Sequence, residues 1–176
     1  MATLRQLLPT DTDRIEGLVE VLQDVVDDGA SVGFLATDEA PELERYWRGV
    51  LQSLGPGLLL WIAEDRGQVV GTVQLAPSMR SNGRHRGDVQ KLLVRASAQG
   101  KGVATALMQV LESHALEHGL SLLVLDTHSG SRAESLYRRL GWQEAGSIPR
   151  YAAVPDGTLI STTYFYKDLR DPQAVL

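Results

Sequence analysis

The stretch Val94-Arg95-Ala96-Ser97-Ala98-Gln99-Gly100-Lys101-Gly102-Val103-Ala104 decides the fold of this 176-residue chain. It follows a strand-like run from Asp88 to Val94 and opens an amphipathic run that is typical of a helix. A glycine-rich helix start leaves several backbone N–H groups without partners, and the helix dipole adds partial positive charge there. The stretch therefore predicts a binding site for phosphate oxygens.

The segments around this glycine loop alternate between helical and strand patterns. Helical spacing of apolar residues covers 15–26, 43–54, 103–118 and 133–140, and β-rich runs cover 4–8, 58–64, 68–75, 88–94, 121–126, 142–147 and 159–167. Thr37 is the expected N-cap of the second helix, and the turn at 65–67 predicts an antiparallel hairpin. The strand–helix–strand order over 88–126 predicts a parallel pair. We expect an α/β fold of the α+β kind, with a mixed sheet of about seven strands and about four helices in a single domain over 1–176.

The composition excludes several classes of protein. A net charge of −5 gives no general attraction to nucleic acid or to an anionic membrane. The absence of cysteine excludes disulfides, a thiol nucleophile and cysteine-based metal sites. Asp11 and Asp13 follow a short apolar start, which is unlike a signal peptide, and no apolar run approaches the roughly 20 residues of a membrane helix. We therefore expect a cytoplasmic protein that binds neither nucleic acid nor membrane.

Two other phosphate-binding loops compete for the same glycines. A dinucleotide site of the Rossmann kind gains support from Asp126, which ends the next strand where a ribose-binding acid would lie. Against it, Thr105 occupies the third glycine position, and five residues separate Val94 from the first glycine. A P-loop fails because Lys101 is followed by glycine, where that motif needs Ser or Thr.

Three further motifs lack the context that their chemistry needs. Residues 29–33 match G-x-S-x-G, but a helical pattern precedes Ser31 where a nucleophile elbow needs a strand. Residues 114–118 match the H-x-x-E-H zinc motif, yet they end a helix, where histidines are common without metal. A basic loop at 80–86 fits either a solvated surface or a contact with a phosphate or an acidic substrate.

From Asp88 to Gly141 the chain resembles the GCN5-related N-acetyltransferases. The resemblance rests on Gln99-x-x-Gly102-x-Ala104 after a strand and on the segment Ala133 to Trp142. It implies acetyl-CoA as co-substrate and no metal. It also implies cofactor contacts through the backbone: pantetheine at Leu92, Leu93 and Val94, and pyrophosphate at Gln99, Gly100, Lys101, Gly102, Val103 and Ala104.

The resemblance also implies how protons move during acetyl transfer. Tyr137 matches a tyrosine that serves many family members as general acid, although its spacing alone indicates a core residue. Asp88 and Asp126 end neighbouring strands, and either is a candidate general base, directly or through water. The alternative for each aspartate is a hydrogen-bonding role at a loop end.

A narrower resemblance is to the tabtoxin-resistance acetyltransferases, which act on a β-lactam amino acid toxin. It rests on 29–34, 89–92, 125–127 and the turn at 155–157. It implies a small-molecule amine acceptor that is amino-acid-like or a β-lactam, and a role in antibiotic resistance. A protein lysine or N-terminal acetyltransferase and a non-catalytic acyl-CoA-binding regulatory domain remain alternatives. The family habit and the β-rich segment 158–167 favour a homodimer.

Overall fold

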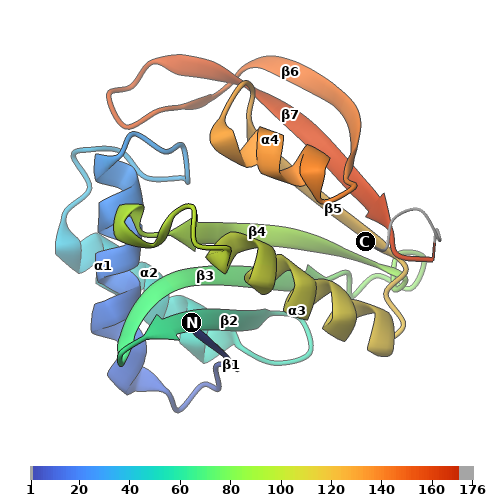
Figure 1. The fold of residues 1–176 in the computed structure, drawn as a ribbon, viewed down its shortest axis with the longest axis horizontal. Coiled ribbons are helices and arrows are strands. Elements are labelled where there is room, and N and C mark those ends of the chain that lie inside the picture. The colour runs from blue at the N-terminus through green and yellow to red at the C-terminus, as the bar shows by residue number, and fades with distance from the viewer. Residues whose placement is uncertain (1, 171–176) are drawn as a thin grey trace.

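A seven-stranded mixed sheet organises residues 2–170, the part of the chain that the computed structural model describes (Figure 1). The strand order is β1-β2-β3-β4-β5-β7-β6. Among the strands within residues 2–170, only β4 and β5 run parallel to each other, and α3 connects them. The strands are β1 (Thr3–Gln6), β2 (Leu59–Asp65), β3 (Gln68–Pro77), β4 (Arg86–Val94), β5 (Leu122–His128), β6 (Gln143–Ala153) and β7 (Leu159–Asp168). The predicted mixed sheet is confirmed.

Four α-helices cover the two faces of this sheet. They are α1 (Ile15–Asp27), α2 (Ala40–Ser53), α3 (Val103–Glu117) and α4 (Arg132–Arg139). Alternation along β2 shows the two faces: Leu60 and Ile62 pack with α1 and α2, whereas Trp61 and Ala63 pack with α3. Each face therefore buries its own apolar cluster, and the sheet is hydrophobic on both sides.

The second helix begins two residues later than the sequence predicted. Glu39, not Thr37, is its N-cap, and Glu39 donates its backbone N–H to the Glu42 carboxylate at 2.6 Å. Thr37 lies in a preceding turn, in which the Asp38 carboxylate accepts the Leu35 N–H at 2.7 Å. Glu39 and Glu42 form the capping box of this helix. Thr37 is not the N-cap, because the turn at 35–38 places it outside the helix.

The predicted hairpin between β2 and β3 is present. Arg66 and Gly67 form its two-residue turn, and both have positive φ, at 50° and 81°. Two positive φ angles define the turn type whose twist matches that of the flanking strands. No helix within residues 2–170 is long and apolar enough to cross a membrane.

Candidate active site

The parallel strands β4 and β5 separate halfway along their length. They pair only over Arg86–Asp88 and Leu122–Val124, while β5 continues to pair with β7 as far as His128. The edge of β4 beyond Asp88 therefore has no strand beside it on the β5 side. A cleft of about 1220 Å³ opens there, and residues 89–94 of β4 line it. This exceeds the usual size of a small-molecule pocket, so a long ligand fits.

The glycine loop closes one end of the cleft. The five-residue offset from Val94 contains a 3₁₀ turn, Ala96–Ala98, and Ala96 donates its N–H to Asp24 of α1 at 2.7 Å. Gly102 is the N-cap of α3 with φ of +79°, and the first helical hydrogen bond runs from Ala106 N to Gly102 O at 3.0 Å. The three preceding amides therefore have no acceptor within the helix, as an anion site requires.

We call residues 92–94 and 99–105 the donor wall. All of them except Lys101 line the cleft. The side chain of Gln99 binds Val94 O at 3.4 Å and accepts from Arg132 Nη1 at 3.2 Å. Arg132 comes from the first turn of α4 and reaches across to the loop. The sequence analysis did not identify this arginine, because the two residues lie 33 positions apart.

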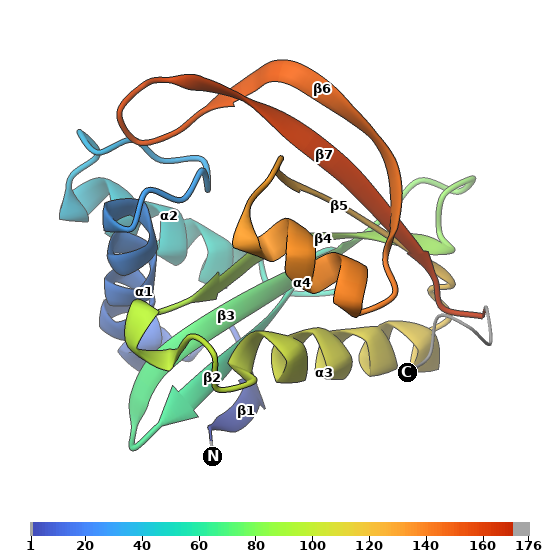
Figure 2. The same ribbon diagram turned by 45° about the horizontal axis from the view of Figure 1, so that its top comes forward.

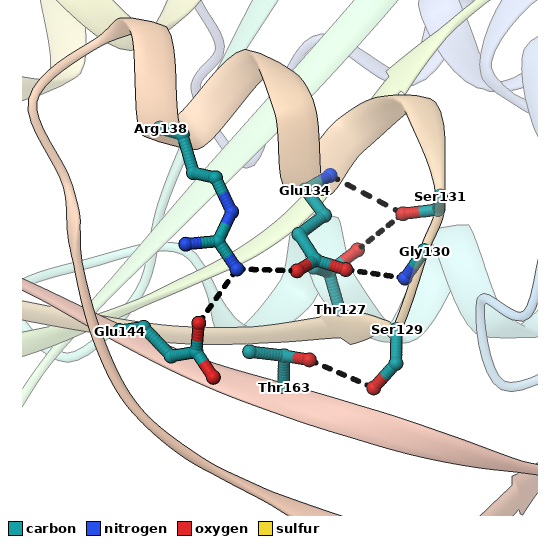
Figure 3. Close-up of polar contacts among 8 residues, drawn as sticks. All are labelled: Thr127, Ser129, Gly130, Ser131, Glu134, Arg138, Glu144 and Thr163. Atoms are coloured by element: carbon teal, nitrogen blue, oxygen red, sulfur yellow. Dashed lines mark hydrogen bonds and ion pairs between the residues drawn. The ribbon is translucent and has the colours of Figure 1, made fainter.

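A polar network at the start of α4 sets the orientation of that helix (Figure 3). Ser131 is its N-cap and accepts the Glu134 N–H at 3.2 Å. The Glu134 carboxylate turns to the Gly130 N–H and to Arg138, and these contacts lower the pKa of Glu134. Ser129 bonds to Thr163 of β7 at 2.7 Å. The turn is thereby tied to the sheet.

Tyr137 and Asp126 meet in the cleft. Tyr137 is 6% exposed, packs against the rings of Trp142 and Phe165, and lines the cleft with Asp126. Burial raises the pKa of Tyr137, and the charge of Asp126 raises it further, so the phenol is protonated at neutral pH. Thr162 of β7 lies with its Oγ1 2.8 Å from Asp126 Oδ2 and fixes the carboxylate.

Asp88 lies apart from these groups. It is exposed, sits opposite Val124 in the paired part of β4 and β5, and does not line the cleft. The two aspartates that the sequence left as alternatives are therefore separated by the structure, since only Asp126 shares the cleft with Tyr137.

The other end of the cleft is built from distant segments. Residues 29–33, which follow α1, face the β6–β7 hairpin, whose turn arches over them (Figure 2). Ser31 Oγ donates to Ala153 O at 2.9 Å, and Ala36 N donates to Pro155 O at 3.0 Å. We call this end the acceptor wall; it comprises 29–33, Lys91, Asp126, Tyr151, Ile160 and Thr162.

A bulge in β4 brings Lys91 into the acceptor wall. The register of β4 against β3 shifts between Thr72 and Gln74, and Lys91 has φ of +48°. Thr72 Oγ1 donates to Lys91 O at 2.8 Å and holds this conformation. The sequence analysis missed Lys91, because alternation along a strand cannot reveal a bulge.

Tyr151 of the same wall is paired with a second tyrosine outside it. Tyr151 of β6 and Tyr164 of β7 bond through their hydroxyls at 2.7 Å. This bond, with desolvation and the charge of Asp126, raises the pKa of Tyr164 to about 12. Tyr151 follows Arg150, whose φ is +53°, in an irregular part of β6. Because β6 is irregular here, strand alternation in the sequence does not reveal the position of Tyr151.

The remaining motifs take structural roles. A helix and a loop precede Ser31, so the strand of a nucleophile elbow is missing. His114 and His118 stack at 3.9 Å, and His114 packs on Trp61, while no group of three metal-binding side chains occurs within residues 2–170. The basic loop at 80–86 precedes the paired start of β4, whereas the cleft opens at the opposite end of that strand.

Comparison with known proteins places the chain in a family. The sequence pattern of the Acetyltransferase (GNAT) family matches residues 19–142. An N-acetyltransferase of the hisH-hisA intergenic region of Azospirillum brasilense, itself uncharacterized, is 27% identical over 75% of this chain and 79% of that protein. N-acetyltransferase 8 of Mus musculus is 36% identical over 64% of this chain. The chain spans about half the length of that relative, 48%.

Solved structures show the same fold. A GNAT acetyltransferase of Streptococcus pneumoniae has a TM-score of 0.75 at 20% identity, over 96% of this chain and 99% of that one. The yncA protein of Salmonella typhimurium, solved with its cofactor acetyl-CoA, has a TM-score of 0.77 at 21% identity, over 97% and 95%. The family match and the named relatives define the class of the protein as an N-acetyltransferase. The chain belongs to the GNAT family of N-acetyltransferases.

Proposed function

We propose that the chain transfers the acetyl group of acetyl-CoA to the amine of a small molecule. The observation that carries the proposal is a continuous path along the cleft. It leads from the free amides at the start of α3, along the open edge of β4, to Tyr137 and Asp126. A phosphate site, an extended binding edge and a pair of proton-transfer groups are the parts that acetyl transfer from a thioester needs.

The donor wall fits the cofactor. The amides of 103–105 and the loop 99–102 would hold the pyrophosphate, with Arg132 as a further cation beside the loop. The unpaired edge of residues 92–94 would bind the pantetheine arm in the way that a strand binds its neighbour. Acetyl-CoA, when bound, supplies the acetyl group as a thioester.

Two side chains handle the protons. Asp126 accepts a proton from the acceptor amine, directly or through water, and Thr162 keeps its carboxylate in place. The Tyr137 hydroxyl donates a proton to the departing sulfur and makes no hydrogen bond to another residue of 2–170, so it is free to do so. The amine nitrogen gains the acetyl carbon as the carbon–sulfur bond breaks. Holding both reactants in one cleft contributes much of the acceleration.

The acceptor wall favours a small acceptor over a protein. The hydrogen bonds from Ser31 and Ala36 to the end of β6 and the turn after it tie two segments together beside this end of the cleft and would obstruct an extended peptide. The segments shared with tabtoxin-resistance acetyltransferases favour an amino-acid-like or β-lactam acceptor and a role in antibiotic resistance.

Because acetyl-CoA is a metabolite of the cytoplasm, we infer that location for the enzyme.

A homodimer is also part of the proposal. Strand β6 is an edge of the sheet, and the hairpin that it forms with β7 exposes Ile148, Tyr151 and Leu159 at 44%, 48% and 50%. An edge strand with exposed apolar side chains is a common pairing surface. Sedimentation at micromolar concentration should give twice the chain mass of 19.2 kDa, and a monomer mass would refute the dimer.

The experiment that tests the function has two parts. Calorimetry should show that acetyl-CoA binds at micromolar concentration, and the absence of binding at high micromolar concentration would refute the proposal. Release of free CoA is then measured against a panel of small amines and a panel of peptides. Transfer to peptides alone would indicate a protein acetyltransferase. Binding without transfer to either panel would indicate a regulatory acyl-CoA-binding domain.

A further inference from the structure

Lys91 lines the cleft, and its ammonium has no counter-ion within residues 2–170. Its ammonium donates to Val32 O at 2.8 Å and lies 5.9 Å and 5.5 Å from the ring centres of Phe34 and Tyr46. It forms no ion pair within residues 2–170. An ammonium has three N–H donors, so two are left for a ligand. Lys91 is half-buried, and a lysine that leaves water is usually paired with an anion.

The surroundings of Lys91 hold it in this position. The left-handed backbone at Lys91 is one that side chains rarely adopt, and such conformations cluster at functional sites. Phe34 and Tyr46 meet edge to face at 5.2 Å and offer their rings to the ammonium. Gln74 is buried and donates to the Tyr46 hydroxyl at 3.2 Å, which fixes that ring. The ammonium is thus held by its neighbours before any ligand arrives.

A negative charge lies in the same wall. Asp126 lines the cleft with Lys91; burial lowers the pKa of Lys91, and the charge of Asp126 offsets only part of this lowering. The two groups do not pair with each other, and Asp126 has no cation beside it within residues 2–170. Its one fixed partner is the hydroxyl of Thr162. One wall therefore presents a cation and an anion that are both free to bind a ligand.

We propose that Lys91 is the specificity-determining residue of the acceptor site, where it binds the carboxylate of a zwitterionic amino acid whose amine lies against Asp126. This inference rests on the proposed acetyl transfer and adds the class of acceptor to it. The α-amine then lies beside Tyr137 and the open edge of β4, where it can attack the thioester. A peptide or a simple amine has no adjacent carboxylate and leaves the ammonium of Lys91 unpaired, which is costly in a buried site.

Matched acceptors test the inference with the unmodified protein. Turnover is measured for free L-amino acids and for the corresponding amino acid amides, which differ only in the carboxylate. The wild type should prefer the acids by about 10- to 100-fold in kcat/KM, since a charge-assisted hydrogen bond contributes on this scale. Equal use of acids and amides would overturn the inference and leave the proposed function intact. Failure to acetylate any small amine would refute the proposed function, and the inference with it.

A substitution of Lys91 tests whether this residue causes the preference for acids. Lys91→Met keeps an unbranched side chain that is one atom shorter and removes its charge, so the acids should lose most of their advantage through KM, while the amides change by less than about 3-fold. Acetyl-CoA affinity of the variant, measured by calorimetry, should stay unchanged and so report an intact cleft. Arg84→Met removes a positive charge from the exposed basic loop outside the cleft and should preserve the preference for acids. Retention of the preference in Lys91→Met would overturn the assignment.

Discussion

The donor wall and the acceptor wall of one cleft are built in opposite ways. The donor wall consists of two short segments, 92–94 and 99–105, and it offers mainly backbone groups. The acceptor wall draws side chains from five separate parts of the chain and relies on two irregular strands, in which Lys91 and Arg150 have positive φ. Backbone recognition tolerates sequence change, whereas side-chain recognition depends on each residue.

Loss of the buried ion pair between α3 and β7 should have the largest effect of the substitutions considered. Glu112 of α3 accepts from Lys167 of β7 at 2.8 Å and from Trp142 Nε1 at 2.9 Å. Glu112→Ala leaves the ammonium of Lys167, which is 4% exposed, without its anion, and we expect a loss of about 3 kcal/mol in the free energy of unfolding. Urea unfolding measures it. The exposed pair of Glu44 and Arg48 provides a control, because Glu44→Ala should cost less than about 1 kcal/mol.

Removal of the phenol should affect chemistry but not the donor wall. Tyr137→Phe keeps the ring between Trp142 and Phe165 and removes the proposed acid, so kcat should fall by about 100-fold while acetyl-CoA affinity is unchanged. Steady-state kinetics and calorimetry separate the two quantities. Tyr166→Phe, whose hydroxyl binds Gln143 on the exposed side of β7, should leave kcat unaltered. An unaltered kcat in Tyr137→Phe would exclude this tyrosine as the acid.

A substitution that disturbs the backbone of the donor wall should weaken acetyl-CoA binding. A Cβ at Gly102 would meet no atom within 4 Å, so Gly102→Val acts through the positive φ of the helix start. We expect acetyl-CoA affinity to fall at least tenfold, because the αL conformation costs a side chain about 1–2 kcal/mol and any relaxation displaces the phosphate-binding amides. Gly67→Val has the same backbone requirement in the β2–β3 turn, remote from the cleft. It should lose similar stability but keep its affinity for acetyl-CoA.

The smallest effect should come from the contact above the acceptor wall. Ser31→Ala removes the hydrogen bond to Ala153 O and leaves Ala36–Pro155 in place. A bond of this kind contributes about 1 kcal/mol, so KM for the acceptor should rise by about fivefold, with acetyl-CoA affinity unchanged. Initial-rate kinetics at saturating acetyl-CoA measure this. An equal loss of affinity for both substrates would show that the two walls are not independent.

Local pattern predicted most of the framework, and it placed the glycine loop at the start of the helix that follows. The glycine pair, the helix after it and the hairpin at 66–67 are each specified by neighbouring residues, since turn chemistry and hydrophobic period act over a few positions. The prediction of Thr37 as N-cap was wrong, because Thr37 belongs to a turn at 35–38 and the helix begins after that turn. Local rules decide elements well and their exact ends less well.

The sequence by itself therefore determined the family and the strand order around α3, and it located the glycine loop that lines one end of the cleft. Only the tertiary structure separated Asp88 from Asp126 and brought Lys91, Phe34 and Tyr46 together. The physical reason is that parallel pairing stops after Asp88 and that a bulge turns Lys91 out of the strand alternation. Neither event leaves a periodic signal, because both arise from the packing of segments that lie far apart along the chain.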